Sequence, residues 1–256
     1  MRALVLTSVE KRHAYFAETI LQSFNLVGII KEKKGNYYSK DENKSPFIRA
    51  HFAALKKYSS SWFANSVWPS VPTLELEKGS INNPKIIRWA KEKRADCIFL
   101  FGTSILNETW LSSFPQKIIN LHLGLSPYYR GSATLFWPIA NQRLECVGTT
   151  IHLAEKYVDS GRILGQIKPK FEVGDNYYDI NLKAIKYSID AIPKYATKYF
   201  NGQLKIHSQD LSVGRVYRKA DFNEKALKKA LDFIGSGLSN QQIRNIELSD
   251  QCVCLS

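Results

Sequence analysis

The segment that decides the fold is residues 117–166, KIINLHLGLSPYYRGSATLFWPIANQRLECVGTTIHLAEKYVDSGRILGQ. It begins with a short apolar strand that leads into Asn120 and His122, and a second strand, residues 148–153, leads to a turn that contains Asp159. Because side chains alternate in direction along a strand, Asn120 and His122 share one face at the strand end. An amide, an imidazole and a carboxylate at strand ends are suited to moving protons and binding an oxyanion. The segment therefore predicts an enzyme.

Five short motifs of this segment also occur together, in this order and spacing, in a known family. The first is an Asn-x-His strand (Asn120, His122), and the second is an Arg-Gly loop (Arg130, Gly131). A Gly-x-Thr-x-His strand (Gly148, Thr150, His152), an Asp-x-Gly turn (Asp159, Gly161) and a final Gln (Gln166) follow. In these motifs the chain resembles the formyltransferases that use 10-formyltetrahydrofolate as co-substrate. The resemblance extends less sharply from the first residue to about residue 200.

The resemblance implies a role for each residue of the catalytic set. Formyl transfer passes through an oxyanion, and it moves a proton from the attacking amine to the leaving amine. Asn120 is expected to hold the formyl oxygen, His122 to donate to the same oxygen when protonated, and Asp159 to favour the charged imidazole. Hydrogen bonds are expected to support this site from Thr150, His152 and Gln166. For His152 a structural role and a catalytic role stay open, and no metal is expected.

The resemblance also implies where the two substrates bind. The folate is expected between the loops 101–106 and 154–158, with backbone groups on the pterin edge and apolar side chains around its ring. The residues expected there are Phe101, Gly102, Thr103, Ile105, Leu106, Tyr157 and Val158. The residues expected to contact the acceptor are Tyr128, Tyr129, Arg130 and Trp137, with Tyr177 and Tyr178 as further stacking surfaces. Arg130 has two open interpretations, a structural role and a contact with an anionic acceptor.

Departures from the family pattern bear on the acceptor. Many relatives carry Pro-Ser after the histidine, where this chain has Leu123 and Gly124, so the loop should differ in shape. Relatives that act on glycinamide ribonucleotide have a Gly-Ser-rich phosphate cradle after the first strand, but residues 7–12 are TSVEKR. Members that act on methionyl-tRNA carry a further barrel-like domain, whereas residues after 202 predict only a helix and a tail. Elimination leaves a nucleotide-linked amino sugar destined for a surface glycan.

Three other functions remain open at this point. A methionyl-tRNA formyltransferase without the usual C-terminal domain fits the basic charge and predicts salt-sensitive tRNA binding. A formylfolate hydrolase uses the same residues with water as the acceptor. A non-catalytic module that binds anions through its lysines predicts that replacing Asn120 or His122 leaves function intact.

Strands and helices alternate through the first two-thirds of the chain, which predicts an α/β, Rossmann-like fold with helices on both faces of a mostly parallel, twisted sheet. Ligands bind at the carboxyl ends of the strands in such folds. Residues 1–202 are predicted to form the catalytic domain, and residues 203–256 a small C-terminal appendage. The predicted strands are residues 3–6, 26–30, 71–76, 97–101, 117–122 and 148–153, with residues 162–171 extended. The predicted helices are residues 14–24, 47–67, 84–93, 134–141, 178–200 and 223–234, and residues 31–45 are a predicted loop.

Composition limits the class of protein. The chain has 256 residues, 44% of them hydrophobic, and a net charge of +13. Its lysines are spread over predicted helix faces, which favours a solvated surface over nucleic-acid binding, although a positive field would also attract an anionic substrate. No signal peptide or membrane span is predicted, and four cysteines without paired spacing favour a reducing cytoplasm. A homodimer is a possible assembly.

Overall fold

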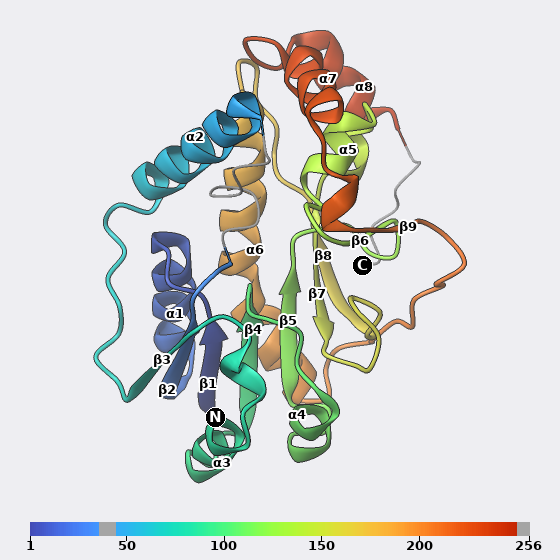
Figure 1. Cartoon of the computed structure of the whole chain (residues 1–256). Coiled ribbons are helices and arrows are strands. Elements are labelled where there is room, and N and C mark those ends of the chain that lie inside the picture. Colours follow the sequence, from blue (N-terminus) through green and yellow to red (C-terminus); the bar gives the residue numbers. More distant parts are fainter. Residues whose placement is uncertain (36–44, 250–256) are drawn as a thin grey trace.

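The computed structural model describes residues 1–35 and 45–249, and Figure 1 shows their arrangement. In this part of the chain a seven-stranded sheet has the order β3-β2-β1-β4-β5-β7-β8. The first five strands of this order run parallel, whereas β7 is antiparallel to both of its neighbours. The predicted Rossmann-like fold with a mostly parallel sheet is confirmed.

The strands of the large sheet are β1 (Arg2–Thr7), β2 (Asn25–Glu32), β3 (Thr73–Leu76), β4 (Cys97–Phe101), β5 (Ile118–His122), β7 (Thr149–Leu153) and β8 (Ile163–Ile167). A small parallel pair consists of β6 (Tyr129–Gly131) and β9 (Arg215–Tyr217). The helices of the described part are α1 (Lys11–Ser23), α2 (Pro46–Trp62), α3 (Pro84–Glu92), α4 (Glu108–Ser113), α5 (Phe136–Ala140), α6 (Tyr177–Phe200), α7 (Glu224–Ile234) and α8 (Asn240–Glu247).

Two apolar clusters cover the two faces of the sheet, because alternate residues of each buried strand point to opposite sides. Val5 and Phe99 belong to the larger cluster, which includes buried side chains of α1 and α6. Leu4 and Ile98 belong to the smaller one, with buried side chains of α3 and α4. Strands that are buried on both faces contain near-continuous apolar runs, as in CIFLF of β4.

Helix α6 agrees with the predicted helix 178–200 to within one residue. It begins after Asn176, whose side chain accepts hydrogen bonds from the backbone N–H groups of Tyr178 and Asp179, and the Asp179 carboxylate accepts one from the Asn176 N–H. This reciprocal cap satisfies N–H groups that have no partner within the helix. The helix packs beside α1 and across β7 and β8, so it supports the strands that lead to the predicted site.

Several predicted boundaries were wrong. Strand β2 continues to Glu32, so the predicted loop 31–45 begins within a strand, and its residues 36–44 lie outside the described part. The helix predicted at 47–67 ends at Trp62, and of the extended segment 162–171 only Ile163–Ile167 pairs in the sheet. The helices α4 and α8 were not predicted, because they are short and therefore show few periods of apolar spacing.

The segment after α6 returns along the β8 edge of the sheet and packs on the main body. A bridge joins His207 to Ile163, β9 pairs with β6, and α7 contacts α5 (Figure 1). Within the described residues, the helices are all too short or too polar to cross a membrane. Two of the four cysteines, Cys252 and Cys254, lie outside the described part of the chain, and Cys97 is a buried free thiol.

Candidate active site

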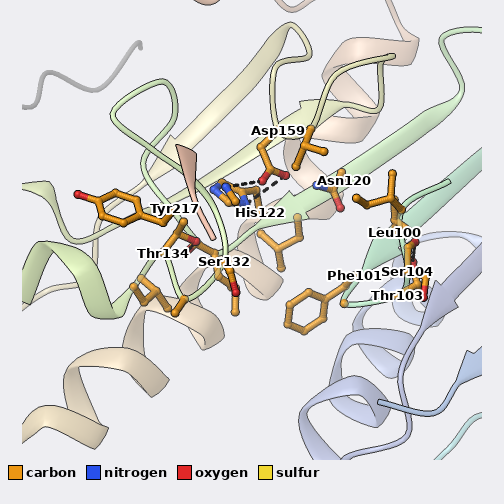
Figure 2. Close-up of a pocket in the computed structure, with 18 of the residues that line it drawn as sticks. Leu100, Phe101, Thr103, Ser104, Asn120, His122, Ser132, Thr134, Asp159 and Tyr217 are labelled. Atoms are coloured by element: carbon orange, nitrogen blue, oxygen red, sulfur yellow. Dashed lines mark hydrogen bonds and ion pairs between the residues drawn. The ribbon is translucent and has the colours of Figure 1, made fainter. Parts of the chain in front are cut away.

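A cavity of about 900 Å³ opens at the carboxyl ends of β4 and β5. Figure 2 shows Asn120, His122 and Asp159 on one side of it, and the turn after β4, including Phe101 and Thr103, on another. Parallel strands bring their carboxyl ends to one edge of the sheet, which is why residues distant in sequence meet here. The cavity therefore lies where the sequence predicted the site.

Asn120 is held by the second histidine of the site. Strands β5 and β7 pair Asn120 with His152, and the Asn120 Nδ2 atom lies 3.0 Å from the His152 Nε2 atom. The His152 Nδ1 atom lies 2.7 Å from the Leu153 carbonyl oxygen, which can only accept, so Nδ1 carries the proton and Nε2 accepts from Asn120. One amide hydrogen of Asn120 is used in this way, and the other is left for a ligand in the cavity.

His122 has an acceptor at each ring nitrogen. Its Nε2 atom lies 2.9 Å from the Tyr129 carbonyl oxygen, and its Nδ1 atom lies 3.3 Å from the Asp159 Oδ1 atom. A neutral imidazole has one N–H, so only the imidazolium satisfies both contacts. Burial lowers the pKa of His122 below its ordinary value, and the Asp159 carboxylate and the Tyr129 carbonyl oppose that shift. These opposing effects suit a group that gains and loses a proton during a reaction.

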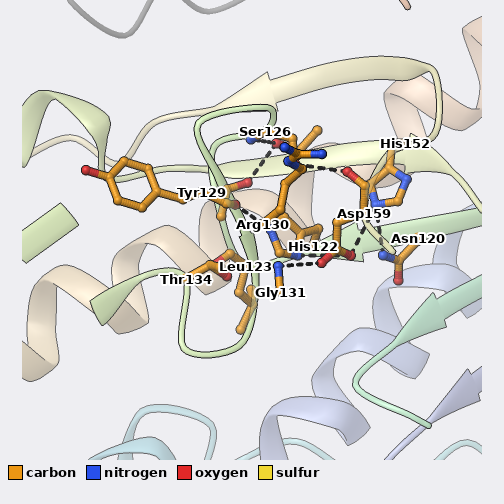
Figure 3. A network of polar contacts seen from close by, with 12 residues as sticks. Asn120, His122, Leu123, Ser126, Tyr129, Arg130, Gly131, Thr134, His152 and Asp159 are labelled. Carbon is orange, nitrogen blue, oxygen red and sulfur yellow. Dashed lines mark hydrogen bonds and ion pairs between the residues drawn. The ribbon is translucent and has the colours of Figure 1, made fainter. Parts of the chain in front are cut away.

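Asp159 joins the two histidines (Figure 3). Its Oδ1 atom lies 3.3 Å from His122 Nδ1 and 3.8 Å from His152 Nε2, and its Oδ2 atom accepts from the Gly131 N–H at 2.9 Å. Burial by itself raises the pKa of the Asp159 carboxyl, but His122, His152 and the Gly131 N–H together hold that pKa well below its ordinary value. Asp159 is therefore a carboxylate throughout the neutral range.

Hydrogen bonds from β7 and β8 hold the loop between His122 and β6. The Thr150 hydroxyl donates to the Gly124 carbonyl at 2.7 Å and accepts from the Ser126 N–H at 2.8 Å. The Gln166 amide donates to the Ser126 carbonyl. Thr150 and Gln166 face each other across the strand pair, so both predicted supporting residues act on the same loop.

The departure at Gly124 affects His122 directly. A Cβ atom at Gly124 would lie 2.4 Å from the Tyr129 carbonyl oxygen and 2.5 Å from the His122 Nε2 atom. These distances are shorter than any stable contact, so only glycine lets the loop close on His122. The sequence connects this departure with the acceptor site, whereas the structure connects it with the position of the imidazole.

We expect the substitution Gly124→Ala to lower kcat at least tenfold, because the added methyl group must push the loop or the His122 ring aside. Overpacking of this kind typically costs about 1–3 kcal/mol of folding free energy, so Tm should fall as well. Steady-state kinetics at a temperature well below the Tm of both proteins separates the two effects. A variant with normal kcat would contradict the close contact between the loop and His122.

All seven residues predicted to bind the folate line the cavity: Phe101, Gly102, Thr103, Ile105, Leu106, Tyr157 and Val158. Ile105 and Tyr157 are 69% and 68% exposed, although both are apolar over most of their surface. Exposed apolar side chains on two loops of one cavity fit a planar ring bound between them. The loop after β4 is held by Glu32, a buried residue at the end of β2. Its carboxylate accepts hydrogen bonds from the N–H groups of Ser104 in that loop and of Gly79 and Ile81.

The four residues predicted to contact the acceptor lie outside the cavity lining. Tyr129 and Trp137 are buried and stack against Tyr217, with ring centroids 5.7 Å and 4.5 Å apart. The Arg130 guanidinium donates to the carbonyl groups of Pro127 and Leu211, which favours its structural interpretation. None of Tyr128, Tyr129, Arg130 and Trp137 is among the described residues that line the cavity, so the cavity gives no support to their predicted contact with the acceptor.

Other side chains, most of which were not predicted from the sequence, surround the rest of the cavity. The aromatic ones are His51 and Phe52 of α2, Phe136 of α5, Tyr177 of α6, and Tyr217 and Phe222 of the C-terminal segment; the cationic ones include Arg12, Lys34 and Lys78. Of these, the sequence predicts only Tyr177, as a stacking surface. These residues come from distant segments without a shared motif, so their convergence depends on the tertiary structure. Among the described residues, no group of three or more His, Cys, Asp or Glu side chains could hold a metal ion.

Comparison with known proteins agrees with this fold. Residues 9–194 match the family model described as formyl transferase. The chain also resembles a sugar N-formyltransferase from Shewanella sp. FDAARGOS_354, with 17% identity, 94% of this chain and 90% of that chain covered, and a TM-score of 0.59. A phosphoribosylglycinamide formyltransferase from Anaplasma phagocytophilum has 17% identity, coverages of 82% and 95%, and a TM-score of 0.58. An N-formyltransferase from Helicobacter canadensis, solved with folinic acid and dTDP-3-aminofucose, has 17% identity, coverages of 91% and 81%, and a TM-score of 0.56.

Proposed function

The chain belongs to the formyl transferase family, and from this premise we propose that it transfers a formyl group from 10-formyltetrahydrofolate to the primary amine of a nucleotide-linked amino sugar. The single observation that carries the proposal is the arrangement of Asn120, His122 and Asp159 at one edge of a cavity large enough for two substrates. A surface glycan is the proposed destination of the product.

Each catalytic residue has a proposed part in the reaction. The amine nitrogen attacks the formyl carbon, the bond from that carbon to the folate nitrogen breaks, and one proton passes from the attacking to the leaving nitrogen. Asn120 donates its free amide hydrogen to the formyl oxygen, where negative charge develops. His122 holds the proton in transit, because its charge is adjustable, and Asp159, which stays a carboxylate, stabilises the imidazolium form.

His122 requires a change of partner if it is to reach the formyl oxygen itself. Both of its nitrogens are engaged, Nε2 with the Tyr129 carbonyl and Nδ1 with Asp159. Direct donation to the oxyanion therefore means that Nε2 leaves Tyr129 when substrate binds. With Nε2 retained on Tyr129, His122 acts through Asp159, and the oxyanion is stabilised by Asn120.

The folate is proposed to lie between the loops after β4 and before Asp159. Ile105, Tyr157 and Val158 enclose its ring, and Leu106 closes the inner end of the site. When bound, it supplies the formyl group as an activated one-carbon unit.

The nature of the cavity wall supports an anionic, ring-containing acceptor. Arg12, Lys34 and Lys78 line it, and among the described residues Glu10 is the carboxylate that pairs with Arg12 and Lys34. Burial lowers the pKa of Lys34 to about 7, so Arg12 and Lys78 supply most of the positive charge at neutral pH. The aromatic side chains on α2, α6 and the C-terminal segment offer stacking surfaces for a sugar or a base. The TSVEKR turn after β1 has no glycine, which argues against the phosphate cradle expected for glycinamide ribonucleotide.

The test is formyl transfer from 10-formyltetrahydrofolate to a panel of amines, with product mass as the readout. The panel contains several nucleotide-linked amino sugars, glycinamide ribonucleotide and methionyl-tRNA. A formyl mass gain on an amino sugar supports the proposal, and gain only on tRNA replaces the acceptor while keeping the reaction. Release of formate without any amine favours a hydrolase. A cytoplasmic location and a homodimer stay predictions. The mass of the purified protein in solution tests the homodimer.

The substitution Lys78→Met should raise the KM for an anionic acceptor about tenfold and leave kcat unchanged, because a charged contact contributes roughly 1.5 kcal/mol or more. Burial lowers the pKa of Lys34 to about 7, so Lys34→Met should have the same effect only below that pH. Lys57→Met, on an exposed part of α2, serves as the matched control. A change in the KM for polyglutamylated but not monoglutamylated folate would instead assign these lysines to the folate tail. Unchanged KM values for both substrates would remove the cationic argument for a nucleotide.

A further inference from the structure

The C-terminal segment contacts both stretches of backbone that hold the His122–Asp159 pair. Residues 209–217 lie beyond the predicted catalytic domain, yet they touch the Asp159 turn on one side and β6 on the other. From the sequence, this region is expected to form short extended pieces of an appendage. Its contacts indicate that it also supports the His122–Asp159 pair.

Gln209 binds the turn that carries Asp159. Its Nε2 atom lies 3.0 Å from the Asp159 carbonyl oxygen and 2.6 Å from the Gly161 carbonyl oxygen. Both partners are acceptors, so the amide group must face them with its two hydrogens, one for each. This is a two-point contact from one side chain to the backbone on both sides of the turn.

The Asp159 turn needs such an external restraint. Asp159 has φ +51°, in the left-handed region that disfavours residues with a side chain. A Cβ atom at Gly161 would lie 1.8 Å from the Leu153 carbonyl oxygen, so the turn is packed against β7 without spare room. A backbone held in an unfavourable conformation relaxes when its restraints are removed, and the carboxylate would move with it.

Strand β9 restrains β6, the second stretch of backbone that contacts His122 and Asp159. The Arg215 N–H donates to the Tyr128 carbonyl at 2.9 Å, and the Tyr217 carbonyl accepts from the Ser132 N–H at 2.8 Å. These bonds bracket β6, whose Tyr129 carbonyl faces His122 and whose Gly131 N–H binds Asp159. The same segment thus fixes the backbone acceptor of the imidazole and the backbone donor of the carboxylate.

We propose that Gln209 is a positioning residue for the His122–Asp159 pair, and that residues 209–217 form a clamp that sets the distance between imidazole and carboxylate. The active site is then incomplete without the C-terminal segment. The proposal rests on the formyl transfer of the family and holds for any acceptor.

The first test is the substitution Gln209→Met, which keeps the length of the side chain and removes its amide donor. Because a small displacement of catalytic groups has a large effect on rate, kcat should fall about tenfold while the KM for the folate co-substrate stays within about twofold. Gln203→Met, at an exposed position of the same segment, is the matched control and should retain the wild-type kcat.

The second readout requires no acceptor. Ring signals of His122 in NMR spectra, assigned by their loss in His122→Ala, report the protonation of the imidazole. Asp159, His152 and Arg130 are the charged or titratable groups that act on it. In Gln209→Met the carboxylate is less well held, so the His122 ring should titrate at a lower pH than in the wild type, with the Gln203→Met control unchanged.

Two outcomes overturn the proposal. A lower Tm with an unchanged kcat and an unchanged His122 titration would make Gln209 a structural contact only. An unchanged Tm, kcat and titration would remove it from the site altogether. If no amine in the panel is formylated but the titration shifts as expected, the clamp stands and the acceptor proposal is the part that fails.

Discussion

Replacement of Asp159 by asparagine is expected to lower kcat for formyl transfer by about 10³-fold, the middle of the usual range for the loss of general acid–base catalysis. Asp159 is the carboxylate that contacts both histidines, at 3.3 Å from His122 and 3.8 Å from His152. An asparagine carries no negative charge to stabilise the imidazolium form of His122, and its amide N–H groups would compete with the ring N–H that now faces Asp159. Folate binding should change little, because the folate loops remain.

The pH dependence of kcat in Asp159→Asn follows from the effect of Asp159 on the pKa of His122. Asp159 opposes the lowering of the His122 pKa by burial, so its removal should lower that pKa further. The limb of the kcat profile that reports loss of the His122 proton should therefore move to lower pH. Kinetics over a pH series checks this, with Asp232→Asn, exposed on α7, as the control. A kcat within about threefold of the wild type would contradict the assigned role.

Stability supplies a second check on Asp159. The pKa of its carboxyl is held below the ordinary value, so the carboxylate stabilises the folded state above the pKa of the unfolded chain, roughly 3.9. This contribution is lost as pH falls through the folded-state pKa. The difference in unfolding free energy between wild type and Asp159→Asn should consequently be largest near neutral pH and shrink in acid.

Replacement of Asn120 by alanine should lower kcat by about 10²–10³-fold, the typical cost of removing one donor to an oxyanion. The donor is needed only when charge develops on the formyl oxygen, so the KM values should change far less than kcat. Asn245→Ala, at a position on α8, is the matched control. Equal losses in kcat for both variants would indicate a general defect.

His152→Ala separates direct from indirect action at this position. His152 orients the Asn120 amide through one hydrogen bond and approaches Asp159 at 3.8 Å. If it acts only by orienting Asn120, its loss should reduce kcat less than the loss of Asn120 itself. A larger loss would assign it a proton-handling part of its own.

The sequence by itself determined the sheet and placed the predicted catalytic residues at its edge. Apolar runs bounded by polar turns identify buried strands such as β4, because a strand covered on both faces tolerates few polar side chains. The motifs around Asn120, His122 and Asp159 are local, and each lies where a strand ends. The seven residues predicted to bind the folate also lie close to strand ends, in or next to two short loops, and this local position brings all of them to the cavity.

Only the tertiary structure decided the acceptor side and the support of the site. The aromatic residues after His122 are buried against Tyr217, whereas His51, Phe52 and Phe222 reach the cavity from α2 and the C-terminal segment. Nor does local sequence show that Gly124 touches His122 or that Gln209 holds the Asp159 turn. Gly124 lies near His122 in sequence, but the closeness of the contact depends on how the loop folds back onto the ring. The other contacts join segments far apart in the chain, and their geometry depends on how the helices and the C-terminal segment pack around the sheet.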